Sequence, residues 1–181
     1  RDQLKFKKAK WSGQEYYVEI WFEAAAMVAQ FRHYTEELPL FAFRGDVSIP
    51  EKWKMAKRLE QASARYGLPV VVLYFGDDDE KGWKIPETAL ADIREWCDQD
   101  FEFVRGGLNE GDGESLEIPE NPDKPGTYQW EALNDEQARQ LIADTVGRYY
   151  DKEALADVQE EEAAVSRKFQ ERFESFIALW E

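Results

Sequence analysis

The segment from residue 69 to residue 82 constrains the fold more than any other part of the chain. Residues 69–75 read PVVVLYF, an uninterrupted apolar run. This pattern is typical of a strand buried on both faces of a parallel sheet. The run ends in Gly76-Asp77-Asp78-Asp79-Glu80-Lys81-Gly82, where the glycines allow the backbone to turn tightly. The chain is therefore expected to build an α/β sheet around this strand.

Further strands and helices alternate along the sequence. Periodicity and turn residues predict strands at 16–22, 39–43 and 101–104, and helices at 24–34, 50–66, 86–96, 135–150 and 152–180. Pro50 suits the start of a helix, and Gly67 suits its end. Alternating strands and helices imply right-handed crossovers. The predicted fold class is α/β, with a Rossmann-like, mainly parallel sheet flanked by helices and a long C-terminal helix.

The length of 181 residues fits one ordinary domain with appendages. We expect residues 1–15 to be a basic N-terminal arm or linker, and residues 16–150 to be the α/β domain. Residues 151–181 are expected to form a C-terminal helix that packs on this domain through an apolar stripe, or else serves as a homodimer surface. Because the chain begins with Arg1 rather than Met, an upstream segment is also expected.

The chain carries 38 Asp and Glu against 23 Lys and Arg, a net charge of −15. Neutralising nucleic-acid phosphates requires Lys and Arg, so this balance argues at first against nucleic acid. An acidic protein can nevertheless meet phosphates through a bound Mg²⁺ ion. Much of the acidic charge lies in the Gly- and Pro-rich stretch 106–136, which is expected to be a loop.

Composition also limits the location of the chain. There is no apolar run near about 18 residues, so no transmembrane helix is predicted, and no secretory signal is visible. A single cysteine and a single histidine exclude a disulfide within the chain and a Cys/His zinc site. These features favour a reducing cytoplasm and no association with membranes.

Acidic residues follow two of the predicted strands. Glu23 comes directly after the first strand, and Asp77 and Asp79 come directly after the most buried strand. Ligands of open α/β sheets bind at these carboxyl ends. Carboxylates crowded at an apolar strand end repel one another unless a cation is present. Oxygen ligands without His or Cys indicate Mg²⁺ or Mn²⁺. The alternative is that residues 76–82 form only a surface turn.

Glu19 competes with Glu23 for a place in this site. The two side chains point to the same face of the strand but lie about 13 Å apart along it. Only the residue at the strand end can meet Asp77, which favours Glu23. Glu19 is expected to be buried against a basic partner or exposed at a sheet edge.

Four segments in this order resemble the Toprim domain, the metal-binding catalytic module of topoisomerases, bacterial primases and several nucleases. They are VEIWFEAAAM, FRGDVS, VVVLYFGDDDEKG, and FVRGGLN followed by YQWEAL. The resemblance spans roughly residues 16–150. It is closest to the branch near the A subunit of topoisomerase VI, which includes stand-alone phage and bacterial relatives.

The resemblance implies roles for particular residues. Glu23 matches the family's Glu, which acts in acid/base chemistry or as a metal ligand, and Asp77 and Asp79 match the Asp pair that holds Mg²⁺. Glu131 matches a later acidic position loosely. Arg44 is expected either to face phosphate or to pair with the acidic cluster. The implied function is Mg²⁺-dependent phosphodiester chemistry on DNA, as a nuclease or topoisomerase-like cleavage module, with an upstream DNA-binding domain.

The sequence also departs from the family pattern. Ala24 stands where this branch usually has Lys, and Glu80-Lys81 replaces a common Pro-Ser. The catalytic Tyr of topoisomerase VI belongs to a separate winged-helix domain, which does not fit within this chain. A second function therefore stays open: a catalytically degenerate Toprim-fold module that binds nucleic acid or a protein partner. A receiver-like fold is a weaker alternative, because this chain has no Lys at the end of a later strand in the place that a receiver needs.

The net charge of −15 generates a prediction about DNA binding. The chain should bind DNA weakly and with a shallow dependence on salt, because few cationic side chains are available to displace counterions from phosphates. Fluorescence anisotropy with labelled duplex DNA over a salt series, in EDTA, measures both quantities. Tight binding without metal would contradict the prediction.

Overall fold

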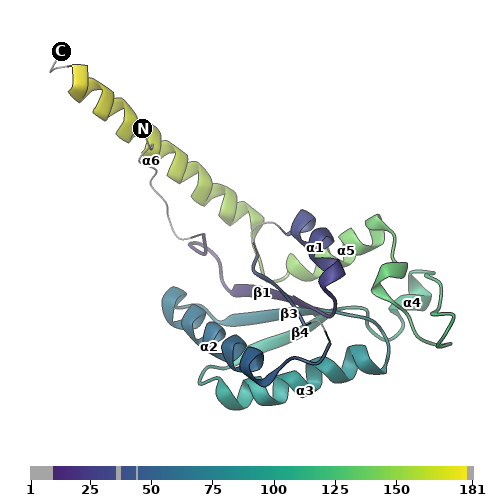
Figure 1. Cartoon of the computed structure of the whole chain (residues 1–181). Helices are drawn as coiled ribbons and strands as arrows, with labels where there is room; N and C mark the ends of the chain where they lie inside the picture. The colour runs from purple at the N-terminus through teal and green to yellow at the C-terminus, as the bar shows by residue number, and fades with distance from the viewer. Residues whose placement is uncertain (1–9, 36–37, 44, 179–181) are drawn as a thin grey trace. The chain divides into compact units, whose positions relative to one another are not determined.

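The structure, a computed structural model, describes residues 10–35, 38–43 and 45–178. Its centre is a four-stranded parallel sheet with the strand order β2-β1-β3-β4 (Figure 1). The strands are β1 (Tyr17–Phe22), β2 (Leu40–Ala42), β3 (Val70–Phe75) and β4 (Phe101–Gly107). The predicted parallel α/β sheet is thereby confirmed.

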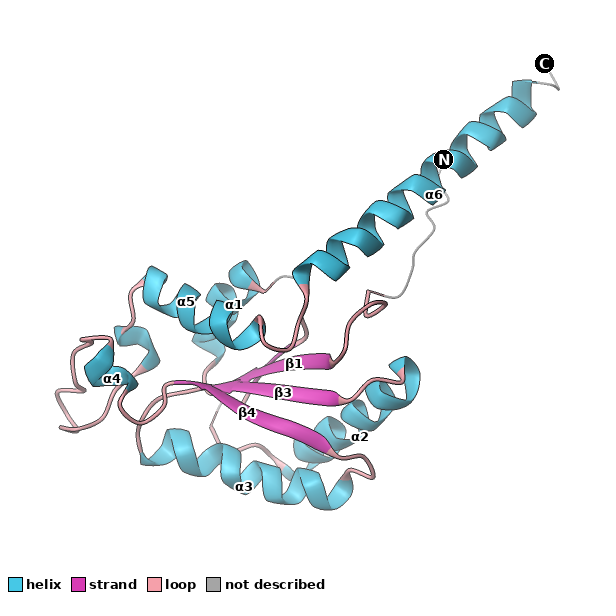
Figure 2. Ribbon diagram, turned by 180° about the vertical axis from the view of Figure 1, so that it is seen from behind, coloured by secondary structure: helices cyan, strands magenta, loops and turns pink. Residues whose placement is uncertain are grey.

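Helices cover both faces of the sheet. They are α1 (Val28–Tyr34), α2 (Ile49–Tyr66), α3 (Glu80–Trp96), α4 (Asp112–Ser115) and α5 (Asp135–Val146), with 3₁₀ turns η1 (Ala25–Met27) and η2 (Trp130–Ala132). Helices α2 and α3 lie on one face, and α1 and α5 lie on the other (Figures 1 and 2). Right-handed crossovers explain this division, because the chain moves outward from β1 to β2 and then returns past β1 to β3.

The reversal places a topological switch point between β1 and β3. These neighbouring strands pair in parallel, with Phe22 opposite Phe75 at their carboxyl ends. From there the chain leads from β1 to one sheet edge and from β3 to the other. Ligands of open α/β sheets bind in the crevice at such a point. The fold therefore places Glu23 and Asp77 at the position where a binding site is expected.

The central strands carry the apolar core. Every residue of β1 and β3 is buried, as the apolar run at 70–75 predicts. On one face Phe31 of α1 packs between the rings of Phe22, Phe75 and Trp130, with centroids 4.9–5.5 Å apart. On the other face Tyr74 packs against aromatic rings from the flanking strand regions. Aromatic packing on both faces fixes the ends of β1 and β3 relative to each other.

Glu19 is buried in the middle of β1 with a basic partner, one of the two arrangements expected. Its carboxylate is fully buried and forms an ion pair with Arg58 of α2 at 2.9 Å. The hydroxyl of Tyr17 and the indole N–H of Trp21 also donate to it, each at 2.9 Å. This carboxylate ties α2 to the sheet, which leaves Glu23 as the acidic residue at the strand end.

Helix α3 begins six residues earlier than the sequence indicated. Pro86 was expected to open it, but the helix starts at Glu80 because the Asp79 side chain accepts a hydrogen bond from Gly82 N and caps it. Pro86 lies inside the helix. Smaller differences are that β4 extends to Gly107 and α5 ends at Val146.

The chain divides into two compact units. One unit is the α/β domain, residues 15–150. The other contains α6 (Lys152–Ala178) and the described residues 10–14. Gln14 exchanges hydrogen bonds of 2.6 and 2.9 Å with the backbone of Asp151. Residues 10–14 therefore group with α6, while the expected arm or linker at residues 1–15 and the docking of α6 on the domain stay predictions.

Among the residues that the structure describes, no helix combines the length and the apolar character needed to cross a membrane. Even α6, the longest, carries charged residues throughout.

Loss of the Glu19–Arg58 pair should destabilise the fold asymmetrically. Arg58→Met should lower the free energy of unfolding by about 3 kcal/mol, because it leaves a fully buried carboxylate without its cation. Glu19→Gln combined with Arg58→Met should recover much of this loss. Urea denaturation of the variants, with Arg65→Met on the exposed side of α2 as control, measures the effect. Equal stability of Arg58→Met and Arg65→Met would contradict it.

Candidate functional site

Glu23 and Asp77 meet at the carboxyl ends of β1 and β3, as predicted. Glu23 N donates to the carbonyl of Phe75 at 3.1 Å, which continues the strand pairing by one residue. Asp77 N then donates to Glu23 Oε2 at 3.0 Å. The two acidic residues are thus held together by backbone geometry, which the register of the central strands imposes.

Two glycines leave room for this arrangement. A Cβ atom on Gly76 would stand 2.9 Å from Glu23 Oε2 and 2.9 Å from the Tyr74 hydroxyl. A Cβ atom on Gly82 would stand 2.1 Å from the carbonyl oxygen of Asp77. Any side chain at either position would push the Glu23 carboxylate or the β3–α3 turn out of place. The glycines on both sides of the Asp-x-Asp sequence are therefore required by close packing.

The surroundings of Glu23 and Asp77 disfavour the ionised form of both carboxyl groups. Burial raises the pKa of Glu23, and the charges of Asp77 and Asp79 raise it further, against the hydrogen bond from Asp77 N. Burial also raises the pKa of Asp77, with Glu131 and Asp79 adding to the effect and the hydrogen bond from Trp130 N opposing it. A cation between the two carboxylates would remove this electrostatic strain.

Asp79 has a different environment from Asp77. One of its oxygens accepts from Gly82 N at 2.8 Å and caps α3, and the other pairs with Lys124 Nζ at 3.2 Å. Burial acts to raise the pKa of Asp79, but the hydrogen bonds from Gly82 and Lys124 outweigh it and lower the pKa. In this structure Asp79 caps α3 and pairs with the ammonium group of Lys124. A role for Asp79 as a metal ligand stays a prediction.

The acidic loop folds back onto the site. The backbones of Asp78 and Tyr128 exchange hydrogen bonds of 2.9 and 3.1 Å. Two residues further on, Trp130 N donates to Asp77 Oδ1 at 2.8 Å. The negative charge of Glu131 acts on Asp77, so the loosely matched acidic position does reach the site electrostatically. Glu131 therefore belongs to the surroundings of the strand ends.

Arg105 of β4 is a central residue of the site that the sequence did not single out. Its guanidinium donates to the carbonyls of Asp77 at 2.6 Å and Gly82 at 2.7 Å, and Nε donates to Leu108 at 2.9 Å. The group stacks on the ring of Trp83, 4.0 Å from its centroid. Burial lowers the pKa of Arg105, but the charges around it oppose the effect. Arg105 thus supplies positive charge that acts on both Glu23 and Asp77.

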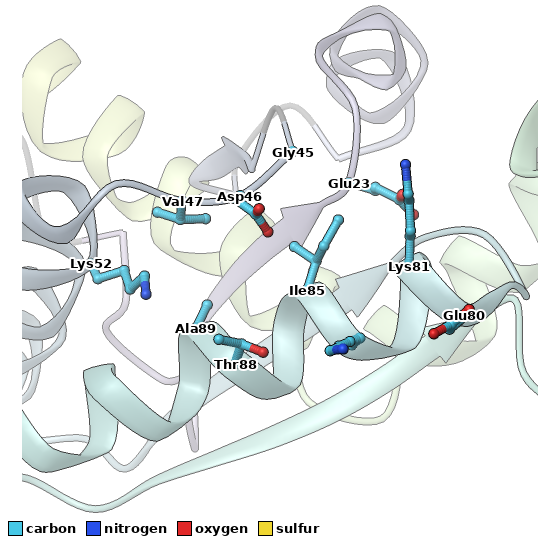
Figure 3. A pocket seen from close by; sticks show the side chains of 11 residues that line it. Glu23, Gly45, Asp46, Val47, Lys52, Glu80, Lys81, Ile85, Thr88 and Ala89 are labelled. Atoms are coloured by element: carbon cyan, nitrogen blue, oxygen red, sulfur yellow. The ribbon is translucent and has the colours of Figure 1, made fainter.

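A pocket of about 700 Å³ opens beside Glu23, between α3 and the residues that precede α2. Figure 3 shows Glu23 at one end of the pocket and Lys52 at the other. Lys81 and Lys84 of α3 line the same space, and Lys81 lies beside Glu23 in Figure 3. The remaining lining residues are Gly45, Asp46, Val47, Glu80, Ile85, Thr88 and Ala89. Arg44, which is expected either to face phosphate or to pair with the acidic cluster, lies outside the described residues.

The residues present fit a Mg²⁺ ion held by few protein ligands. Within the described part of the chain, no three carboxylate, imidazole or thiolate groups converge as a complete ligand set. Mg²⁺ usually keeps several water molecules and takes only one or two carboxylates from a protein. Glu23 and Asp77, with their raised pKa values and oxygen donors, meet that requirement. The donor chemistry also suits Mn²⁺.

Comparison of the chain with models of known families, with curated protein sequences and with solved structures found no match.

Neutralising one carboxylate should stabilise the metal-free protein. A raised pKa means that the folded state binds the proton more tightly than the unfolded chain, so this contribution to stability is lost as pH rises through the raised pKa. Glu23→Gln should therefore match the wild type near about pH 4 and exceed its Tm by about 2–4 °C near pH 7. Differential scanning fluorimetry in EDTA, with exposed Glu87→Gln as control, measures the difference. A lower Tm of Glu23→Gln at neutral pH would contradict it.

Proposed function

We propose that this chain carries out Mg²⁺-dependent phosphodiester chemistry on DNA, as a nuclease or as the cleavage module of a topoisomerase-like assembly. The observation that carries the proposal is the pairing of Glu23 and Asp77 at the switch point of the sheet, where burial and mutual repulsion leave both carboxylates in need of a cation. The same residues occupy the acidic positions of the Toprim-like segments, which supports a Toprim domain as the identity of residues 16–150.

Each residue has a distinct role in the proposal. Asp77 and Glu23 would hold the cation, which would neutralise the phosphate and stabilise the leaving oxygen. Where Asp77 alone holds the cation, Glu23 would instead move a proton, because its raised pKa suits acid/base work better than that of an ordinary carboxylate. Arg105 fixes the turn that carries Asp77 through its bonds to the carbonyls there. The nucleophile is water in a nuclease, or a Tyr from another domain in a topoisomerase-like assembly.

The pocket beside Glu23 supports a phosphate-bearing substrate. Lys81 and Lys84 are three residues apart on α3 and so lie on one side of the helix. Neither forms an ion pair with another described residue, so both are available to a ligand. Lys81 could supply near Glu23 the positive charge that Ala24 lacks. The substrate would then place a phosphate between these side chains and the acidic pair.

A second candidate function is a degenerate Toprim-fold module that binds nucleic acid or a protein without cleaving it. The observation that favours it is the engagement of Asp79, whose two oxygens are used by Gly82 N and Lys124. The substitution of the usual Lys by Ala24 points the same way. Metal binding at millimolar concentration separates the two functions.

The proposal includes partners beyond the site. DNA contacts would come largely from an upstream DNA-binding domain, because the net charge of −15 opposes DNA binding by this chain.

A homodimer through α6 is proposed because Phe169 and Phe173 are about half exposed on it. We also propose the cytoplasm as its location, on the basis of its lone cysteine.

The central experiment measures metal binding and cleavage in parallel. Isothermal titration calorimetry with Mg²⁺ and Mn²⁺ should detect binding by the wild type and its loss in Asp77→Asn, because that variant removes a charged oxygen ligand. The double variant Asp77→Asn/Asp79→Asn should have no Mg²⁺-dependent activity on plasmid DNA. Asp100→Asn is the control, because Asp100 is exposed and directly precedes β4, at the amino ends of the strands and away from the site.

The outcomes distinguish the two functions. Binding and cleavage that both depend on Asp77 support the enzyme. Absence of metal binding at millimolar concentration favours the degenerate module. Undiminished cleavage by the double variant would overturn the assignment of the site. Comparison of Asp79→Asn alone shows whether that residue is a ligand or acts only as a helix cap, since a pure cap would lower Tm without removing metal binding.

A further inference from the structure

The hydroxyl of Tyr74 is buried and makes no hydrogen bond. Tyr74 lies near the end of β3, its side chain is fully buried, and its hydroxyl oxygen has no partner within hydrogen-bonding distance. Folded proteins rarely leave a buried polar group unbonded, and such a group calls for a specific explanation. A phenylalanine would pack in the same place without this penalty.

This hydroxyl is directed toward the acidic pair. The Tyr74 oxygen and Glu23 Oε2 each lie 2.9 Å from the point where a Cβ atom of Gly76 would stand. Both oxygens therefore border the same small space, which is open only because residue 76 is glycine. The charges of Glu23, Asp77 and Arg105 all act on the hydroxyl, which shows that it belongs to the site electrostatically.

The ring of Tyr74 is held while the Glu23 carboxylate can adjust. Aromatic rings of Phe43 and Phe103 pack against Tyr74 with centroids 5.5 and 5.8 Å away, and the Arg105 guanidinium lies 5.4 Å from its centre. Glu23 lies at the mouth of a pocket and is only half-buried. A small movement of Glu23 therefore brings its carboxylate to the hydroxyl, whereas the hydroxyl itself is fixed.

We propose that Tyr74 is a positioning residue of the cation site, whose hydroxyl donates a hydrogen bond to the Glu23 carboxylate when that carboxylate holds a divalent ion. Carboxylates that bind metals are generally oriented by such outer hydrogen bonds, and their loss weakens metal binding. The unbonded hydroxyl is then a donor available to the carboxylate that holds the ion. The inference rests on the proposed function, in that the site takes a divalent cation.

Tyr74→Phe tests the proposal, because it removes one oxygen atom from the packed core. Calorimetric titration of the full chain with Mg²⁺ should show an affinity roughly tenfold lower than that of the wild type. In EDTA the Tm should stay unchanged or rise by about 2 °C, because the buried hydroxyl has no partner to lose. Tyr149→Phe, which removes an exposed hydroxyl bonded to Glu102, should change neither metal affinity nor Tm by a comparable amount.

Gly76→Ala serves as a positive control for disruption of the site, because its methyl group would displace the Glu23 carboxylate directly. It should also lower the Mg²⁺ affinity, measured well below its own Tm. Wild-type binding with unchanged affinity in Tyr74→Phe overturns this inference and leaves the proposed function standing. Absence of Mg²⁺ binding in the wild type overturns both. A lower metal-free Tm with unchanged affinity in Tyr74→Phe would show that the hydroxyl is purely structural.

Discussion

The guanidinium of Arg105 is the contact on which the arrangement of the site depends. It bonds to backbone carbonyls of residues 76, 77, 82 and 108, and so joins the end of β4 to the end of β3 and the first turn of α3. The bond to Gly82 has a specific cause. Pro86 has no N–H with which to bond the carbonyl four residues earlier, so that carbonyl is left for Arg105. A proline inside a helix is thus stabilised by a cation from a neighbouring strand.

The electrostatics of the site are divided between two kinds of carboxylate. Asp79 has its requirements met by a helix N-terminus and by Lys124, and it stabilises the turn. Glu23 and Asp77 receive only backbone hydrogen bonds, and their burial works against their charge. Carboxylates whose ionised form is disfavoured in the folded protein are typical of binding sites, whereas structural carboxylates usually have a partner that stabilises their charge. The overall charge of −15 is therefore less informative than the burial of these two carboxylates.

The sheet and the acidic pair could be predicted from sequence because they depend on local patterns. An unbroken apolar run identified β3, and parallel strands must align Glu23 and Asp77 at one edge. The start of α3 was misplaced because Pro86 is a stronger sequence signal than the Asp79 cap. Arg105 and Tyr74 could not be found in this way, since their roles depend on contacts between strands whose register no local pattern specifies. The positions of Lys124 and Trp130 depend equally on how the acidic loop folds back.

The paired hydrogen bonds between Gln14 and Asp151 make the α/β domain a closed insert. The rings of Tyr16 and Tyr149, just inside the two ends of this domain, also contact each other, with centroids 5.6 Å apart. The chain therefore enters and leaves the α/β domain at adjacent positions. Domains with adjacent ends tolerate transfer into other hosts and circular permutation, because neither disturbs the interior. Residues 15–150 have the architecture of a transferable cassette, which could be carried by different flanking modules without any change to the strand ends that hold Glu23 and Asp77.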